Sequence, residues 1–198
     1  MIAAMPKISR DSLMTLEAYS KARKDFRAKV IAHKKARTVH LGDHVTLLFE
    51  DELTVRYQVQ EMLRIEKIFE DEGIQDELDA YNPLVPDGRN WKATMLIEYE
   101  DVNERAAALA KLRGIEDRTW VQVEGCAKVY AIADEDLDRE HDTKPSAVHF
   151  VRFELTKEMV EALKYGVALA MGADHPEYTT KVDAVGAETR ASLLGDLA

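Results

Sequence analysis

The spacing of apolar residues changes along the chain, and each change marks an expected element. Over residues 15–37 apolar side chains recur at three- and four-residue steps, which predicts a long N-terminal helix that stops before Gly42. Residues 51–72 predict a second helix that is apolar around most of its circumference. A helix of this kind packs on more than one side, so we expect it to be the central, buried helix.

The rest of the chain alternates short strand patterns with further helical stretches. Strand patterns cover residues 44–50, 92–100, 118–124, 127–133 and 147–155. Helical patterns cover residues 74–81, 102–113, 156–170 and 188–194, and residues 134–145 predict a charged loop. This order predicts an α+β fold with a single mixed or largely antiparallel sheet of about five strands, packed with the two long helices. Without repeats or a Gly/Ser linker, we expect one domain over residues 1–198.

Charge is distributed unevenly between the two ends of the chain. The net charge is −10, but residues 1–40 hold ten Lys/Arg and three Asp/Glu, while residues 41–198 hold seventeen and thirty-four. A basic N-terminal helix can lie on its own acidic body, or it can contact an acidic partner. It also permits a homo-oligomer held by charge complementarity, without requiring one. Binding of nucleic acid is disfavoured because the acidic remainder repels phosphates.

The composition excludes several classes of protein. The only cysteine is Cys126, so a disulfide scaffold is excluded. No apolar run approaches the ~20 residues of a membrane helix, and the start of the chain lacks the pattern of a secretory signal, so we expect a cytoplasmic protein without a membrane partner. No phosphate-binding loop, dinucleotide fingerprint, nucleophile elbow or zinc-protease motif is present, which leaves open whether the protein is an enzyme.

Two carboxylates of the second helix are candidate metal ligands. Glu66 falls in the middle of its apolar arc, and Glu61 lies at the edge of its apolar surface. A buried carboxylate must be paired, protonated or bound to a metal. The alternatives are therefore a ligand or general base, and a structural ion pair with an arginine such as Arg105 or Arg152.

Three histidines complete the candidate metal set. His44 precedes a strand, His149 alternates with apolar residues on another strand, and His175 precedes Pro176 after the helix expected at 156–170. Carboxylate and imidazole ligands together suit iron, manganese or zinc. Each histidine also has a structural interpretation, such as a core histidine with satisfied hydrogen bonds for His149 and a helix cap for His175.

Several blocks of the sequence together resemble a known family. They are residues 49–72, 91–117, 120–125, 147–156 and 172–178, with the segment SRDSLMTLEAYSKARKDFR near the start. This pattern is similar to a bacterial family catalogued only as domain of unknown function 3501. The resemblance implies no assigned chemistry. It implies a context, because similar proteins are encoded beside rubrerythrin-like proteins and iron–sulfur oxidoreductases.

Two functions therefore compete. The first is a non-enzymatic accessory or regulatory protein linked to redox or oxidative-stress metabolism, which contacts a redox partner through the basic face of the first helix at Arg23, Arg27 and Lys34. The second is a small metal-binding protein or metalloenzyme with Glu and His ligands. The two differ in one geometric requirement, because metal ligands must converge within about 2.0–2.3 Å of one ion.

Overall fold

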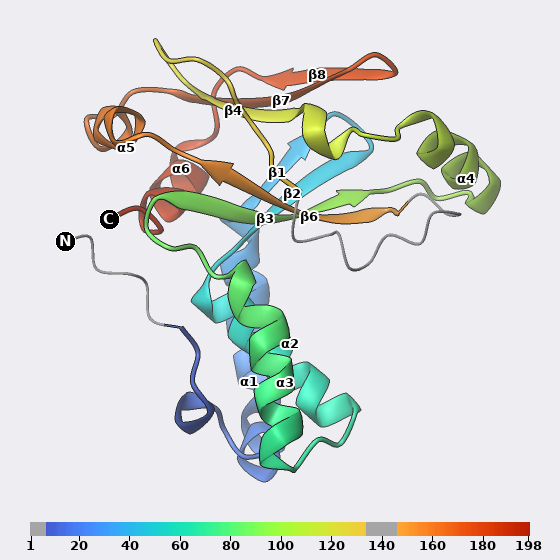
Figure 1. Ribbon diagram of the computed structural model, residues 1–198, viewed down its shortest axis with the longest axis vertical. Coiled ribbons are helices and arrows are strands. Elements are labelled where there is room, and N and C mark those ends of the chain that lie inside the picture. Colours follow the sequence, from blue (N-terminus) through green and yellow to red (C-terminus); the bar gives the residue numbers. More distant parts are fainter. Residues whose placement is uncertain (1–6, 134–145) are drawn as a thin grey trace.

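A helical arm projects from a body made of two β-sheets (Figure 1). The computed structural model describes residues 7–133 and 146–198, so the expected charged loop at 134–145 lies outside the described residues. The arm is formed by η1 (Arg10–Ser12), α1 (Leu16–Lys35), α2 (Glu52–Ile65) and α3 (Asp71–Tyr81), followed by η2 (Asn82–Leu84). The body carries α4 (Val102–Lys111) at one end and α5 (Lys157–Lys164) with α6 (Ala187–Leu194) at the other, and η3 (Glu116–Arg118) lies between α4 and α5 in the sequence.

The body contains two four-stranded antiparallel sheets. The first has the order β1 (Thr38–Leu41), β2 (Val45–Glu50), β3 (Asn90–Ile97) and β6 (Val148–Glu154). The second has the order β5 (Val129–Tyr130), β4 (Thr119–Val123), β7 (Leu169–His175) and β8 (Tyr178–Val182). The α+β class is thus confirmed, whereas the single sheet of about five strands is wrong.

The second sheet differs from the expectation because residues 169 and 170, expected to end a helix, begin β7. The helix expected at 156–170 ends at Lys164, and Gly166 follows with a φ of 93°. Such a left-handed residue ends helices. Gly172, two residues after the expected end of this helix, lies inside β7, where a Cβ atom would come within 2.5 Å of the Trp120 ring. That glycine is needed for close packing between β7 and β4.

Local signals place the two long helices of the arm. The Thr15 side chain caps α1 by accepting a hydrogen bond from the backbone of Ala18, and Asp51 caps α2 by accepting one from Thr54. Such caps satisfy backbone donors that a helix start leaves unpaired. Because β1 and β2 lie between α1 and α2 in the sequence, the two helices leave the body side by side (Figure 1). The arm is therefore an extension of the first sheet.

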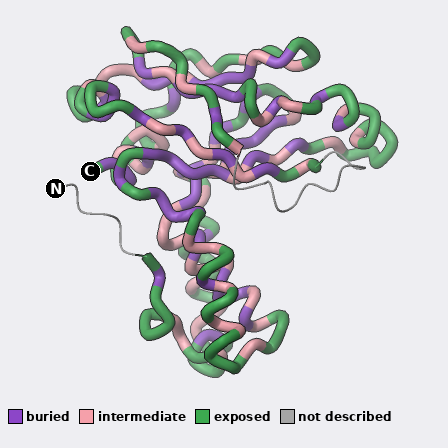
Figure 2. Tube along the Cα trace, in the orientation of Figure 1, coloured by how far each residue is buried: buried purple, intermediate pink, exposed green. Residues whose placement is uncertain are grey.

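Two hydrophobic clusters stabilise the two parts (Figure 2). The larger one fills the body and includes the fully buried Phe49, Trp91 and Met171. The smaller one fills the arm, where Val55, Val59, Leu63 and Leu78 are buried between α2 and its neighbours. As expected, α2 is packed on more than one side, against α1 and against α3.

Candidate functional site

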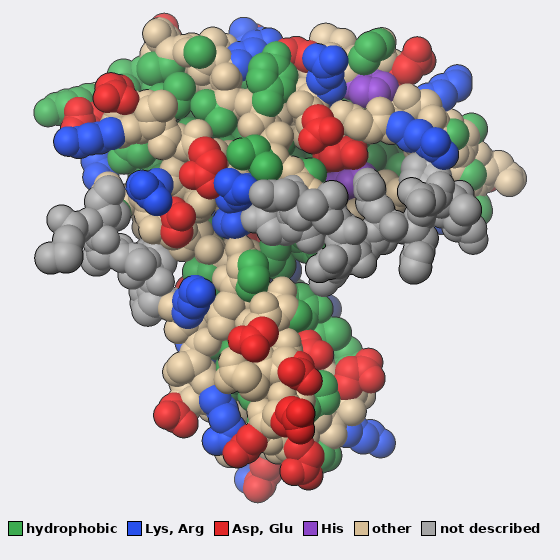
Figure 3. Space-filling view, in the orientation of Figure 1, with side chains coloured by type: hydrophobic (Ala, Val, Ile, Leu, Met, Phe, Trp, Pro, Cys, Tyr) green, Lys and Arg blue, Asp and Glu red, His purple; other side chains and the backbone are tan. Residues whose placement is uncertain are grey.

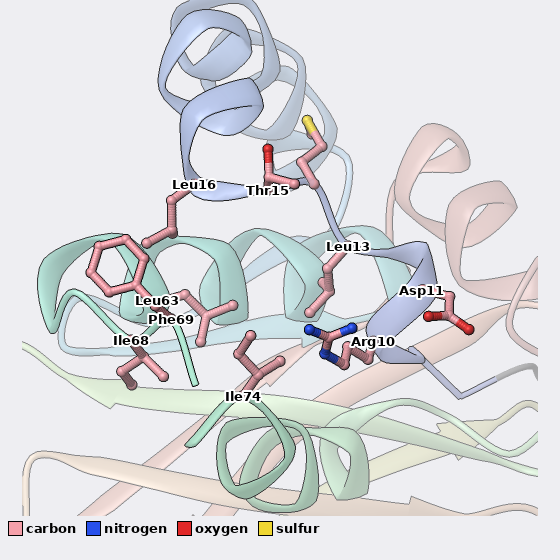
Figure 4. Close-up of a pocket in the computed structure, with 10 residues that line it drawn as sticks. Arg10, Asp11, Leu13, Thr15, Leu16, Leu63, Ile68, Phe69 and Ile74 are labelled. Carbon is pink, nitrogen blue, oxygen red and sulfur yellow. The ribbon is translucent and has the colours of Figure 1, made fainter. Parts of the chain in front are cut away.

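A cavity opens at the end of the arm that is distant from the sheets. It has a volume of about 300 Å³ and lies between the segment before α1, the end of α2 and the start of α3 (Figure 4). Most of its wall is apolar, formed by Leu13, Leu16, Leu63, Ile68, Phe69 and Ile74. Arg10 and Asp11 lie together at one end. We call this region, with residues 65–72 and the start of α1, the arm tip.

The turn that ends α2 builds one side of this cavity. Lys67 has a φ of 54°, and the backbone N–H of Ile68 donates to the carbonyl of Leu63 at 3.0 Å. A left-handed residue followed by a bond to the carbonyl five residues earlier is a Schellman termination. It ends α2 at Ile65, so the helix expected over 51–72 is shorter than predicted. The same turn brings Ile68 over Leu63, and both line the cavity.

Apolar side chains at the arm tip are exposed to solvent. Phe69 is 67% exposed, and Ile65 is 52% exposed. Single exposed apolar residues are common, but Phe69 also lines the apolar cavity, and an exposed apolar side chain that extends such a cavity is of the kind that marks interaction sites. In Figure 4 the Phe69 ring lies next to Leu16, with Leu63 and Ile68 close by.

Carboxylates surround the apolar surface. Residues 66–79 contain seven Asp/Glu and one lysine, and acidic side chains cover much of the lower arm (Figure 3). Arg10, at the end of the cavity, forms an ion pair with Asp71. Burial raises the pKa of Glu77, with further contributions from the nearby charges of Glu66 and Asp76. These carboxylates therefore repel one another, and a cationic group would relieve that repulsion.

A buried polar cluster holds α1 against α2 above the arm tip. Glu61 accepts hydrogen bonds from the Tyr19 hydroxyl at 2.6 Å and from Arg23 Nε at 2.7 Å. Arg64 Nη2 lies 3.3 Å from the second Glu61 oxygen. The Arg23 hydrogen bond is the main cause that lowers the pKa of Glu61 to about 2, against the opposing effect of burial. The cluster is an internal ion pair that fixes the walls of the cavity.

The two candidate carboxylates have different environments. Glu66 is exposed at the C-terminal cap of α2, because the helix ends there instead of continuing to 72. The expectation that Glu66 is buried is therefore wrong. Glu61 is buried as part of an ion pair, but its partner is Arg23, not Arg105 or Arg152. Its oxygens are occupied by donors from Tyr19, Arg23 and Arg64.

The candidate histidines lie on separate elements of the body. His175 ends β7; its Nε2–H donates to the Arg113 carbonyl at 3.1 Å, and its Nδ1 accepts from the Glu177 backbone at 3.2 Å. His149 lies in β6, with Nε2 3.0 Å from the Ser146 carbonyl. His44 precedes β2 and stacks on Tyr99. Within residues 7–133 and 146–198, no three His, Cys, Asp or Glu side chains are placed to hold a metal ion.

The three basic residues of the expected contact surface do not share one environment. Arg23 turns inward to Glu61, and Lys34 lies half-buried with its ammonium 5.8 Å from the centre of the Tyr57 ring. Arg27 is exposed. Of these three residues, Arg23 and Lys34 make contacts within the chain, and Arg27 is exposed to solvent.

The sequence patterns do not predict the arm tip. Residues 66–69 continue the apolar pattern of the helix expected at 51–72, which predicts Ile68 and Phe69 within that helix and not in a turn. The signal that could have located the turn is the dense run of charge at Glu70, Asp71 and Glu72, which is typical of the first turn of a new helix.

Comparisons with known proteins give a family but no assigned chemistry. The family described as "Protein of unknown function (DUF3501)" matches residues 7–197. A similar solved structure is that of a novel protein of unknown function from Burkholderia pseudomallei K96243, which is 57% identical. The match covers 98% of this chain and 100% of that one, with a TM-score of 0.93. No curated protein matches. Among the described residues, no helix combines the length and apolar character needed to cross a bilayer. The chain belongs to the DUF3501 family of proteins of unknown function.

Proposed function

We propose that the chain is a non-enzymatic accessory protein that binds a partner protein through the arm tip. One observation carries the proposal: an apolar cavity, with Phe69 exposed beside it, lies within a surface rich in carboxylates. A rim of charge around an apolar centre is the usual organisation of a protein-binding surface. The family resemblance supports a redox protein as the partner.

The chemistry of the arm tip selects the partner segment. The apolar wall fits one aliphatic or aromatic side chain, whose burial contributes roughly 1.5–3 kcal/mol. The exposed carboxylates of Glu66, Glu70 and Glu72 favour lysines or arginines on both sides of that side chain. The expected partner therefore presents one apolar residue among cationic residues.

The metal-binding alternative receives no support from the described residues. Glu66 lies at the arm tip, while His44, His149 and His175 lie in the body. Glu61 is engaged by Tyr19, Arg23 and Arg64, as described above.

A binding experiment with a defined probe tests the proposal. The probe is a fluorescent helical peptide of alanine and lysine with one central leucine, and its anisotropy is measured while the full chain is titrated. We expect saturable binding that weakens about tenfold, equivalent to about 1.4 kcal/mol, in Phe69→Ser. A peptide with serine in place of leucine should bind the unmodified chain as weakly as the leucine peptide binds Phe69→Ser.

The matched control is Tyr165→Ser, because Tyr165 is an aromatic residue that is 90% exposed on the body. This variant should bind the leucine peptide as the unmodified chain does. Equal binding by the Phe69 and Tyr165 variants, or equal binding of the leucine and serine peptides, would show that the arm tip is not the docking site.

A further inference from the structure

We infer that the arm tip also receives α1 of a second copy of this chain, with Ile31 as the inserted side chain. The inference rests on the proposed function, since it assigns a second occupant to the same cavity. It gives the chain a self-associated state in which the docking surface is covered. Three observations carry it: the exposure of Ile31, its charged neighbours, and its position relative to the cavity.

Ile31 is an apolar residue on the solvent side of α1. It is 45% exposed, although the buried side of the same helix carries Tyr19 and Val30. At 100° per residue, Lys24, Arg27 and Lys35 lie within about 40° of Ile31 around the helix axis. All three are exposed. The chain therefore carries the motif that the arm tip selects, one apolar side chain among cationic ones.

Leu16 in the cavity wall and Ile31 lie on nearby sides of α1. Leu16, which lines the cavity, and Ile31 are fifteen residues apart on one continuous helix. Fifteen residues correspond to a rotation of about 60° and a rise of about 22 Å. One neighbouring arm can therefore contact both places at once, without a change in either arm.

A two-fold arrangement satisfies both contacts. If two arms pack antiparallel, Ile31 of each copy meets the cavity of the other, because each copy presents both patches along the same flank. Arg27 and Lys35, one helical turn to either side of Ile31, then lie nearest the partner's carboxylates at residues 66–72. The same patches occur twice, so the contact closes into a dimer and does not continue into a filament.

Sedimentation velocity of the full chain tests the dimer. We expect a sedimentation coefficient that rises from the monomer value toward the dimer value between micromolar and near-millimolar protein at low salt. The shift should shrink at high salt, because exposed ion pairs are screened. Ile31→Asp and Phe69→Asp should each remain monomeric, while Tyr165→Asp should behave as the unmodified chain. Circular dichroism checks that each variant is folded.

Mixing the two variants separates a specific contact from general loss of apolar surface. The Ile31→Asp copy keeps an intact cavity and the Phe69→Asp copy keeps Ile31, so their mixture restores one of the two contacts and should form a weak heterodimer. Absence of self-association in the unmodified chain, or self-association unchanged in both variants, would overturn the inference. The Ile31→Asp variant should still bind the leucine peptide, so failure of the dimer is distinguishable from failure of the proposed function.

Discussion

Arg37 and Asp196, which lie 159 positions apart in the sequence, form a buried ion pair where the arm meets the body. Arg37 Nη2 is 2.5 Å from Asp196 Oδ2. The same guanidinium donates to the backbone carbonyl of Phe49 at 2.9 Å and to that of Glu50 at 3.1 Å, and it is 1% exposed. One side chain thus fixes the end of α1, the end of β2 and the C-terminal segment to one another.

Arg37→Ala should lower the free energy of unfolding by about 3–5 kcal/mol. The substitution leaves the Asp196 carboxylate buried without its partner and leaves two buried carbonyls without their donor, which is the costly way to break an ion pair. Urea denaturation measures the change. The control is Arg27→Ala, an exposed residue of the same helix, which should change stability by about 0.5 kcal/mol at most. A similar small effect in both variants would contradict the role given to Arg37.

The Asp196 carboxyl should make stability fall as the pH rises through mild acid. Burial raises its pKa from 3.8 to about 6, although the charge of Arg37 acts in the opposite direction. The folded chain therefore holds the proton more tightly than the unfolded chain, and stability decreases between about pH 4 and pH 6. Asp196→Asn cannot titrate. We subtract the free energy of unfolding of the variant from that of the unmodified chain. This difference should decrease between about pH 4 and pH 6 and be flat above pH 6. An increase across the same range would refute the assignment.

Glu61 should give the opposite dependence at lower pH. The Arg23 hydrogen bond lowers its pKa from 4.5 to about 2, so its stabilising effect is complete above pH 4.5 and is lost as the pH falls toward 2. Glu61→Gln should be about 2 kcal/mol less stable at neutral pH, with a difference that disappears over that window. Glu17→Gln removes an exposed pair with Lys21 and should show a difference near zero at every pH. A pH-independent deficit in Glu61→Gln would contradict the prediction.

Much of the fold was predictable because the local signals agree with the packing. Thr15 and Asp51 are polar caps before apolar periodic segments, and both helices begin where these caps indicate. The second sheet was not predictable in the same way, because β7 is defined by its pairing with the distant β4, and β8 is in turn defined by its pairing with β7. Gly172 illustrates the difficulty. A glycine is required there because the ring of Trp120, 52 positions away in the sequence, packs against it.

The candidate site was less predictable than the fold. Helical periodicity places Glu61 near a boundary between apolar and polar surfaces, and it is indeed buried, but no pattern identifies Arg23 as its partner across two helices. Periodicity also continues through Glu66 to Phe69, while the backbone turns at Lys67. Sequence patterns describe helix faces well, but they do not show where a helix stops when the stop residue is not glycine.

Lys67→Gly should stabilise the chain by about 0.5–1 kcal/mol. Lys67 occupies the left-handed position after α2 with a φ of 54°, a conformation that glycine adopts without steric cost. The matched change, Lys29→Gly on the exposed side of α1, should destabilise by about 1 kcal/mol, because that position requires ordinary helical geometry. Thermal or urea unfolding measures both changes. Destabilisation by the Lys67→Gly substitution would show that the turn is not in the left-handed conformation.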